Sequence, residues 1–283
     1  MARRKQPTAR QERLGSELRK LREAAGLKGR DAAALLGTDS AQLSQIEFGT
    51  AGVSEERVRR LAAHYACTDT ELTEALVAMA TDRTHGWWEE YRGHLPNSFL
   101  DLSELEHHAT SRWDVDLLHV SGLLQTEDYA RALFSTRIPE LPESELELRV
   151  RHRMQRRLII QGATPTPYEA VIHEAALRIR VGGRAAAHAQ LARILELSEA
   201  DHVTVRVIPF ALDRFDDTGS AMIYANGVVP KLDTVVRDGP HGTTFIDSEA
   251  QLGVFRTLFR RVEAASLGPE RSRELIHKLA KEL

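Results

Sequence analysis

The feature that most constrains the fold is the stretch at residues 29–48, where small and apolar residues occupy positions typical of two crossing helices. Ala33 falls where two such helices would touch, and Gly37 falls where the turn between them needs a positive φ. The expected apolar inner face consists of Leu35, Leu36, Leu43 and Ile46. These positions together predict a helix-turn-helix, whose second helix fits the major groove of DNA.

The helical pattern extends beyond this motif on both sides. Thr8 is the expected N-cap of a first helix, Ser54 caps a fourth, and residues 68–71 form an expected capping box before a fifth. Five short helices predict a compact all-α helix-turn-helix domain over residues 12–81, preceded by a basic arm at residues 1–11. The alternative interpretation of the same pattern is a helical bundle that binds proteins.

Four segments resemble the phage-repressor-like (Xre) DNA-binding domains over residues 12–80. They are Leu-Arg-x-Leu-Arg-x-x-Ala-Gly-Leu (18–27), Leu-Leu-Gly (35–37), Gln-Leu-Ser-Gln-Ile-Glu-x-Gly (42–49) and Val-x-x-Leu-Ala-x-x-Tyr (58–65). Members of that family usually begin the first motif helix with a glutamine that holds a DNA phosphate. Gly29 stands there in this chain, between Lys28 and Arg30, and Arg30 is the expected replacement.

The predicted recognition helix begins after Asp39, its expected N-cap. The expected base-reading residues are Ser40, Ala41, Ser44 and Gln45. Gln45 is the most specific of these, because its amide can bond bidentately to adenine. The expected phosphate contacts are Arg3, Arg4, Lys5, Lys28, Arg30 and Gln42.

Positive charge is concentrated in the same half of the chain. Residues 1–60 hold 13 Lys and Arg against 8 Asp and Glu, a net of +5, whereas the whole chain carries −3. Double-stranded DNA is therefore the expected partner. The arm containing Arg3, Arg4 and Lys5 either contacts DNA or is a solubilising tail.

A length of 283 residues with 42% hydrophobic content allows a second domain. No apolar run is long enough to span a membrane, and the N-terminus lacks the apolar core of a signal peptide. We therefore expect a cytoplasmic protein associated with the nucleoid. Cys67 is the only cysteine, and it is expected to be a packed thiol.

The second half has a mixed pattern after a linker at residues 82–97. Helical periodicity is expected at residues 98–111, 126–134, 142–160, 185–197, 248–265 and 269–281. Strand patterns are expected at residues 113–117, 168–172, 202–209, 221–224 and 232–236. Residues 98–283 are thus expected to form an α+β domain with a small sheet covered by helices.

Further blocks in this half resemble the large C-terminal domain of actinomycete WhiJ-type regulators. They are Val-Ser-Gly-Leu-Leu-Gln-Thr-x-Asp-Tyr-Ala-Arg-Ala (120–132), His-Glu-Ala-Ala-Leu-Arg (173–178), Val-Gly-Gly (181–183), Gln-Leu (190–191) and Val-x-Val-x-Val-Ile-Pro (203–209). The usual proline of the first block is Ser121 here. The resemblance implies a developmental or antitoxin-like transcription factor, often with a small acidic partner protein.

The sequence predicts neither an enzyme nor a cofactor or metal site. His173 and Glu174 begin like a zinc-protease helix, but the second histidine position holds Leu177. Gly182 and Gly183 lack the third glycine and the acidic residue of a dinucleotide site. A catalytic site assembled from residues far apart in sequence is the alternative.

Two surfaces are candidates for binding proteins. The loop and helix containing Leu123, Leu124, Tyr129 and Arg131 would form a partner groove or else pack in the core. The last two helices would form a homodimer interface or else pack in the core. The expected function is a sequence-specific, dimeric transcriptional repressor. The alternative is an antitoxin-like adaptor that sequesters a small acidic protein and uses DNA binding for autoregulation.

Overall fold

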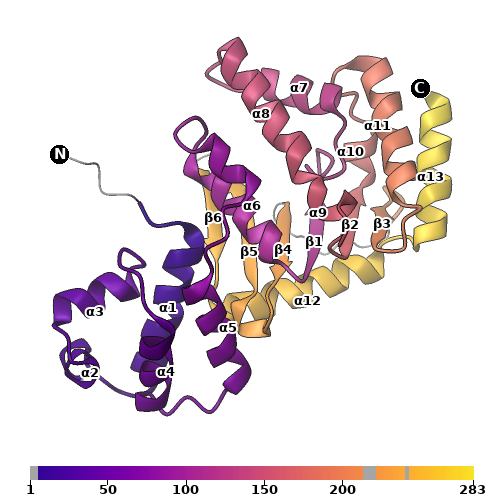
Figure 1. Cartoon of the computed structure of the whole chain (residues 1–283). Helices are drawn as coiled ribbons and strands as arrows, with labels where there is room; N and C mark the ends of the chain where they lie inside the picture. The colour runs from indigo at the N-terminus through magenta and orange to yellow at the C-terminus, as the bar shows by residue number, and fades with distance from the viewer. Residues whose placement is uncertain (1–5, 213–220, 240–241) are drawn as a thin grey trace. The chain divides into compact units, whose positions relative to one another are not determined.

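The computed structural model describes residues 6–212, 221–239 and 242–283. The chain divides into two compact units, Met1–Glu89 and Glu90–Leu283 (Figure 1). Arg3, Arg4 and Lys5 of the expected basic arm lie outside the described residues. No helix in the described part of the chain is long and apolar enough to cross a membrane.

The described residues of the first unit form five α-helices, which confirms the expected all-helical fold. Side-chain caps set where helices begin: Thr8 caps the first helix and Ser54 the fourth, as expected. The fifth helix differs from the expected capping box, because Asp69 rather than Thr68 is its N-cap and accepts the N–H of Leu72 at 2.9 Å. The helices are α1 (Ala9–Ala24), α2 (Gly29–Leu36), α3 (Ser40–Glu47), α4 (Glu55–His64) and α5 (Thr70–Thr81).

The structure contradicts the prediction that Leu35 belongs to the apolar inner face. Leu35 is 38% exposed, whereas Leu36 is 4% exposed. Neighbouring residues on a helix point about 100° apart, so α2 directs Ala32, Ala33 and Leu36 inward and turns Leu35 outward. The core of the unit is otherwise made from every helix, with Leu18, Leu43, Val58, Leu61 and Leu76 fully buried.

The second unit is an α+β fold around one six-stranded sheet, which confirms the expected fold class. The strand order is β3-β2-β1-β4-β5-β6. Strands β1 and β2 pair in parallel, as do β2 and β3, and the remaining pairs are antiparallel. The strands are β1 (Ser111–Asp116), β2 (Tyr168–His173), β3 (Val203–Ile208), β4 (Met222–Asn226), β5 (Thr234–Gly239) and β6 (Gly242–Ile246).

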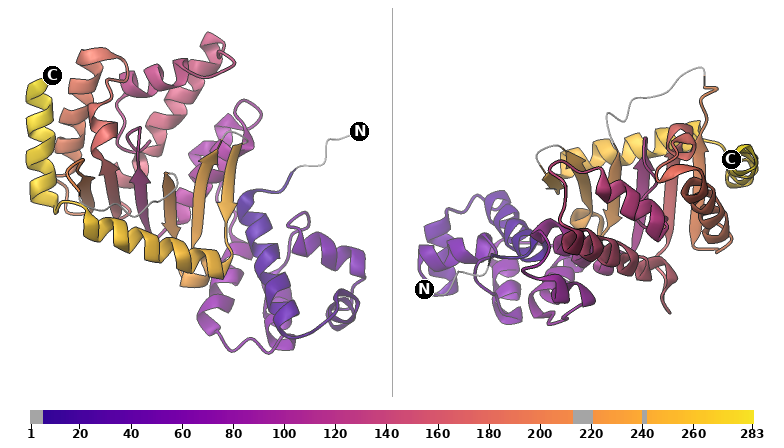
Figure 2. Two further views of the ribbon diagram at one scale, coloured as in Figure 1. Left: turned by 180° about the vertical axis from the view of Figure 1, so that it is seen from behind. Right: turned by 90° about the horizontal axis from the view of Figure 1, so that it is seen from above.

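Helices cover both faces of this sheet (Figure 2). On one face, α12 packs against alternate residues of the strands, including Val115, Tyr224 and Val235. On the other face, residues from α7, α10, α11 and α13 form a larger apolar cluster with β2 and β3. The helices of the unit are α6 (Asn97–His108), α7 (Glu127–Ser135), α8 (Glu143–Arg156), α9 (Leu158–Gln161), α10 (Glu174–Arg178), α11 (Gly183–Leu197), α12 (Glu249–Ala265) and α13 (Pro269–Glu282).

Some elements differ from the sequence pattern. The sequence pattern did not predict strand β6 or helix α10. It also did not predict the 3-10 helices η1 (Trp87–Tyr91) and η2 (Pro230–Leu232). The single long helix expected at residues 142–160 is divided at Arg157 into α8 and α9, and Pro142 is the N-cap rather than a first-turn residue. These are short or boundary features, for which hydrophobic periodicity gives little signal.

Three of the four residues of the expected partner groove take the alternative position, in the core. Leu123 and Leu124 are 0% exposed and Tyr129 is 1% exposed, so all three belong to the large apolar cluster. The Tyr129 hydroxyl accepts the backbone N–H of Val120 at 3.1 Å, which ties the loop to α7. Arg131 is half-buried and forms ion pairs with Glu127 and Glu147. Apolar burial is therefore what these adjacent leucines provide.

The last two helices also pack into the core through their central apolar residues. Leu252 and Phe259 of α12 and Ile276 and Leu279 of α13 are each at most 3% exposed. The start of α13 additionally covers the outer edge of β3, since Ser272 Oγ accepts the N–H of Val207 at 2.9 Å. These residues therefore hold the second unit together.

Candidate nucleic-acid interface

The turn before α3 has the geometry that a helix-turn-helix requires. Gly37 ends α2 with φ 68° and ψ 35°, the left-handed conformation expected for this position. Two residues later, Asp39 begins α3 and its carboxylate accepts the N–H of Gln42 at 2.7 Å. The glycine and the cap together fix the angle and the first turn of α3.

The inner face of α3 packs unusually closely against α1. Leu43 and Ile46 are 1% and 2% exposed. A Cβ atom added at Gly15 of α1 would lie 2.5 Å from the carbonyl oxygens of Ile46 and Glu47. Only glycine permits this approach, and no helical periodicity in the sequence identifies it. The end of α3 is therefore seated directly on the backbone of α1.

An ion pair fixes the same end of α3. Arg22 of α1 donates to both carboxylate oxygens of Glu47, at 2.6 and 2.9 Å, and to the carbonyl oxygen of Leu27 at 2.8 Å. The side chains of Arg22 and Glu47 are 11% and 9% exposed. Hydrogen bonding to Glu47 raises the pKa of Arg22. Burial raises the pKa of the neighbouring Tyr65 to about 12, so Tyr65 is neutral at physiological pH.

The opposite face of α3 is exposed at most of its positions. The predicted base-reading residues Ser40, Ala41 and Gln45 are exposed, and Ser44 is half-buried. Gln42, predicted to contact phosphate, is exposed beside them. One long face of a helix whose other face is rigidly packed is the geometry used for reading bases in the major groove.

Phe48 belongs to the same exposed stripe, and the sequence analysis did not identify it. Ala41, Ser44 and Gln45 precede it at helical spacing, and its N–H donates to Ser44 at 2.9 Å. Its side chain is 59% exposed although it is large and apolar. The signal available in the sequence was this spacing of three, four and seven residues along one face.

The predicted phosphate contacts of α2 lie at its start. Lys28 is the N-cap residue but makes no side-chain capping bond, and both Lys28 and Arg30 are exposed. Arg30 Nε donates to Asp31 at 3.2 Å, with 78% of its side chain exposed. Backbone N–H groups at an uncapped helix start attract phosphate, and two flanking cations strengthen that attraction.

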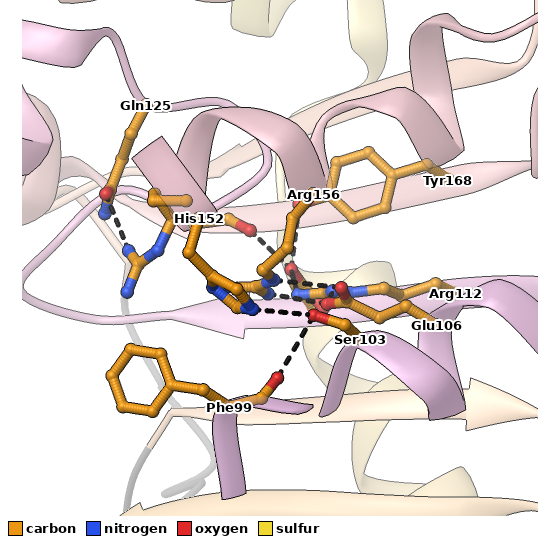
Figure 3. Close-up of polar contacts among 11 residues, drawn as sticks. Phe99, Ser103, Glu106, Arg112, Gln125, His152, Arg156 and Tyr168 are labelled. Carbon is orange, nitrogen blue, oxygen red and sulfur yellow. Dashed lines mark hydrogen bonds and ion pairs between the residues drawn. The ribbon is translucent and has the colours of Figure 1, made fainter. Parts of the chain in front are cut away.

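The second unit contains a buried polar network (Figure 3). Arg112 of β1 donates to Asp114 through Nε and Nη2, both at 2.7 Å, and forms an ion pair with Glu106 of α6. Arg156 of α8 donates through Nε to Glu106 at 2.9 Å. Tyr168 of β2 donates to Asp114 at 2.8 Å. The network thus joins α6, α8 and two strands.

Burial alone would raise the pKa of Glu106, but Arg156 and Arg112 hold it below its usual value. Burial and the nearby Asp114 raise the pKa of Asp116 well above its usual range, and Asp116 Oδ2 has no hydrogen-bond partner among the described residues. Burial also lowers the pKa of Arg153 to about 9. The alternating polar residues of β1 therefore face buried charges rather than solvent, which the pattern alone did not indicate.

Known families match both units. Residues 13–76 match a family model described as a helix-turn-helix domain. Residues 99–278, more than half of the chain, match a family model described as a domain of unknown function (DUF5753). No curated protein and no solved structure matches the chain.

Proposed function

The chain belongs to the family that carries the domain of unknown function DUF5753, and on that premise we propose that it is a dimeric, sequence-specific transcriptional repressor. Its helix-turn-helix domain indicates a DNA-binding regulator. The observation that carries the proposal is the exposed face of α3, because its inner face is fixed by the contact at Gly15 and the ion pair of Arg22 with Glu47. A rigid, solvent-facing helix can position polar side chains against base edges.

Gln45 is the proposed main reader, and Ser40, Ala41 and Ser44 surround it. Its amide can accept from and donate to adenine in the major groove, whereas serine hydroxyls discriminate less. Phe48 extends the stripe by one turn, and an exposed aromatic ring there would pack against the methyl group of thymine. Lys28, Arg30 and Gln42 would contact phosphates, which sets orientation and salt dependence.

The experiment that tests the proposal is retention of fragmented genomic DNA by the full-length protein at physiological salt, followed by sequencing. Recovery of discrete sites that share an inverted repeat supports it, with half-sites about 34 Å apart or a multiple of that distance. Retention that is unselective and disappears with added salt contradicts sequence-specific binding. Changed expression of the genes next to the recovered sites, after deletion of the gene for this chain, decides between repression and activation.

Variants of α3 then separate reading from positioning. We expect Gln45→Ala to cost about 1–3 kcal/mol at a recovered site and little on random DNA. Gln42→Ala is the matched control on the same helix, and we expect it to weaken binding equally on both. Equal losses for Gln45→Ala on both DNAs would mean that Gln45 only positions the protein.

The role of Phe48 can be tested by changing the DNA instead of the protein. Replacing a contacted thymine by deoxyuridine removes only the methyl group, and it should weaken binding by the intact protein. The same replacement should leave Phe48→Ala unaffected, since the contact is already gone. Additive losses from the two changes would show that Phe48 and the methyl group do not interact.

A dimer is proposed because one recognition helix reads too few base pairs to find a single site in a genome. On this proposal the second unit carries the dimer contact and any ligand or partner, and it binds rather than catalyses. DNA binding by the first unit would keep the protein in the cytoplasm on the nucleoid. The antitoxin-like adaptor loses its supporting surface, since Leu123, Leu124 and Tyr129 are buried. Stoichiometric recovery of a small acidic protein with the native chain would restore that alternative.

A further inference from the structure

The central apolar residues of α12 and α13 are buried, so they are not available for the dimer contact of the second unit. Phe259 and Ile276, the most central apolar residues of these helices, are 0% exposed. The outer edge of β3 is also occupied, because Leu267 donates to the carbonyl oxygen of Val207 at 2.8 Å and Ser272 Oγ accepts the N–H of Val207. The sheet therefore offers its other edge for a contact.

That other edge is β6, the last strand in the sheet order. It pairs with β5 from Gly242 to Ile246, and within the described ranges no strand pairs with its outer side. A strand paired on one side directs alternate backbone N–H and C=O groups outward, where they can accept another strand. Thr244, at the centre of β6, is exposed.

The composition of β6 favours strand addition. Its sequence is Gly-Thr-Thr-Phe-Ile, which contains no charged residue and no proline. Threonine, phenylalanine and isoleucine are among the residues most enriched in strands. Natural edge strands commonly carry a lysine, a proline or a bulge that prevents pairing with another molecule, and β6 lacks the first two.

We propose that two copies of this chain pair through the outer edges of their β6 strands, antiparallel and about a two-fold axis, so that their sheets become continuous. This inference rests on the proposed function only in its choice of partner, since a DNA site with two-fold symmetry needs a second copy of the same chain. The strand edge itself is independent of that function.

The side chains of β6 suit this arrangement. Ile246 lies opposite Val235 and packs with the α12 cluster, whereas Phe245 lies opposite Val236 on the other face. A two-fold axis perpendicular to the sheet keeps each face on its own side, so apolar side chains of the two copies meet on matching faces. Two half-buried residues thereby lose further contact with water.

An interface built on one five-residue strand is small. Contacts below about 1,200 Å² of total buried surface are typical of weak or transient association. We therefore expect a monomer–dimer equilibrium near micromolar concentration that shifts to dimer on a DNA fragment containing both half-sites. DNA supplies the second contact by holding the two copies at high effective concentration.

The test is the oligomeric state of the full-length chain with Thr244→Glu, measured by analytical ultracentrifugation with and without DNA. Arg237 lies opposite Thr244 in β5, so a carboxylate at this exposed position suits the monomer while it repels its copy across the axis. We expect the dissociation constant of the dimer to rise by at least about tenfold. An equimolar mixture of Thr244→Glu and Thr244→Lys should restore a dimer, since opposite charges then face each other.

Val254→Glu is the matched control. Val254 is 66% exposed on α12, so its replacement introduces the same charge on a different surface of the same unit. We expect it to dimerise like the unchanged chain, and far-ultraviolet circular dichroism checks that every variant is folded. A monomer at all concentrations with and without DNA overturns the proposal, as does a Thr244→Glu chain that dimerises normally or a Val254→Glu chain that does not.

Failure of the proposed function would look different. A chain that dimerises through β6 but retains no discrete DNA sites keeps this inference and contradicts the regulator. A chain that selects inverted repeats yet dimerises equally well with Thr244→Glu keeps the regulator and contradicts the β6 contact. Association of Thr244→Glu through the first unit would give the second result.

Discussion

Arg22 and Glu47 form a two-pronged ion pair between α1 and the last residue of α3, with nitrogen–oxygen distances of 2.6 and 2.9 Å. Both side chains are about nine-tenths buried. Because the pair lies at the end of the proposed recognition helix, it links the stability of the first unit to the direction in which that helix points.

Removing one partner of this pair should destabilise the first unit. We expect Arg22→Met to cost about 3 kcal/mol of unfolding free energy, because Glu47 is left as a buried, uncompensated carboxylate. Urea denaturation measures the change. Arg59→Met is the control, since Arg59 and its partner Glu74 are 44% and 54% exposed and their loss should change the transition little. Equal effects of both variants would contradict the role assigned to Arg22.

The close contact at Gly15 makes a second prediction. Gly15→Ala places a Cβ atom 2.5 Å from the carbonyl oxygens of Ile46 and Glu47, so α3 must move away from α1. We expect a loss of about 1–3 kcal/mol in stability, typical of an overpacked core, and weaker binding at specific DNA sites. Thermal denaturation and DNA titration measure the two effects.

Gly29→Ala is the matched control for Gly15→Ala. Both glycines are helical, but a Cβ atom at Gly29 meets nothing within 4 Å and its φ is not positive. Alanine there should leave stability unchanged or slightly increased, because it reduces the freedom of the unfolded chain. A Gly29→Ala variant that loses as much stability as Gly15→Ala would contradict the role assigned to the contact between Gly15 and α3.

The buried network of the second unit carries a third prediction. Arg112 is 1% exposed and neutralises both Glu106 and Asp114. We expect Arg112→Met to cost about 3–5 kcal/mol, because two carboxylates lose their shared cation in a region that excludes water. Adding Asp114→Asn should recover part of that loss. Without such recovery in urea denaturation, lost packing rather than unpaired charge would explain the effect.

The sequence predicted the elements with strong local signals. Gly37, Asp39 and Thr8 act through the conformation or capping of their own turn, so their roles could be inferred from neighbouring residues alone. The sheet strands rich in Val and Ile were likewise expected, and they form the sheet.

Features that depend on distant parts of the chain could not be predicted in this way. Gly15 matters only because Ile46 and Glu47 approach it. Likewise, Glu106 pairs with Arg112 and Arg156 only after the unit has folded. The sequence places such partners far apart, and a single sequence carries no covariation between them. The same reason explains why Leu123 and Leu124 fitted both a groove and a core until their burial was known.

The stability of the second unit should depend on pH through His152, and the burial of this histidine sets the sign of the dependence. Burial and the nearby Arg156 lower the pKa of His152 to about 3 in the folded protein, whereas a histidine in an unfolded chain has a pKa of about 6.5. As the pH falls below the unfolded value, the unfolded chain takes up a proton that the folded chain does not bind. Stability from this site is therefore fully present above the unfolded pKa and is lost as the pH falls toward the folded pKa.

We expect the unfolding free energy of the second unit to decrease by up to about 1.4 kcal/mol per pH unit between pH about 6 and about 4 from this residue alone. Urea denaturation of His152→Gln across that range should give a shallower dependence than the unchanged chain. The substitution keeps a polar side chain near Ser103, whose hydroxyl lies 3.1 Å from His152 Nε2. His188→Gln, at an exposed position of α11, should leave the slope unchanged. If His152→Gln also left it unchanged, the buried carboxylates rather than the histidine would govern the acid sensitivity of the unit.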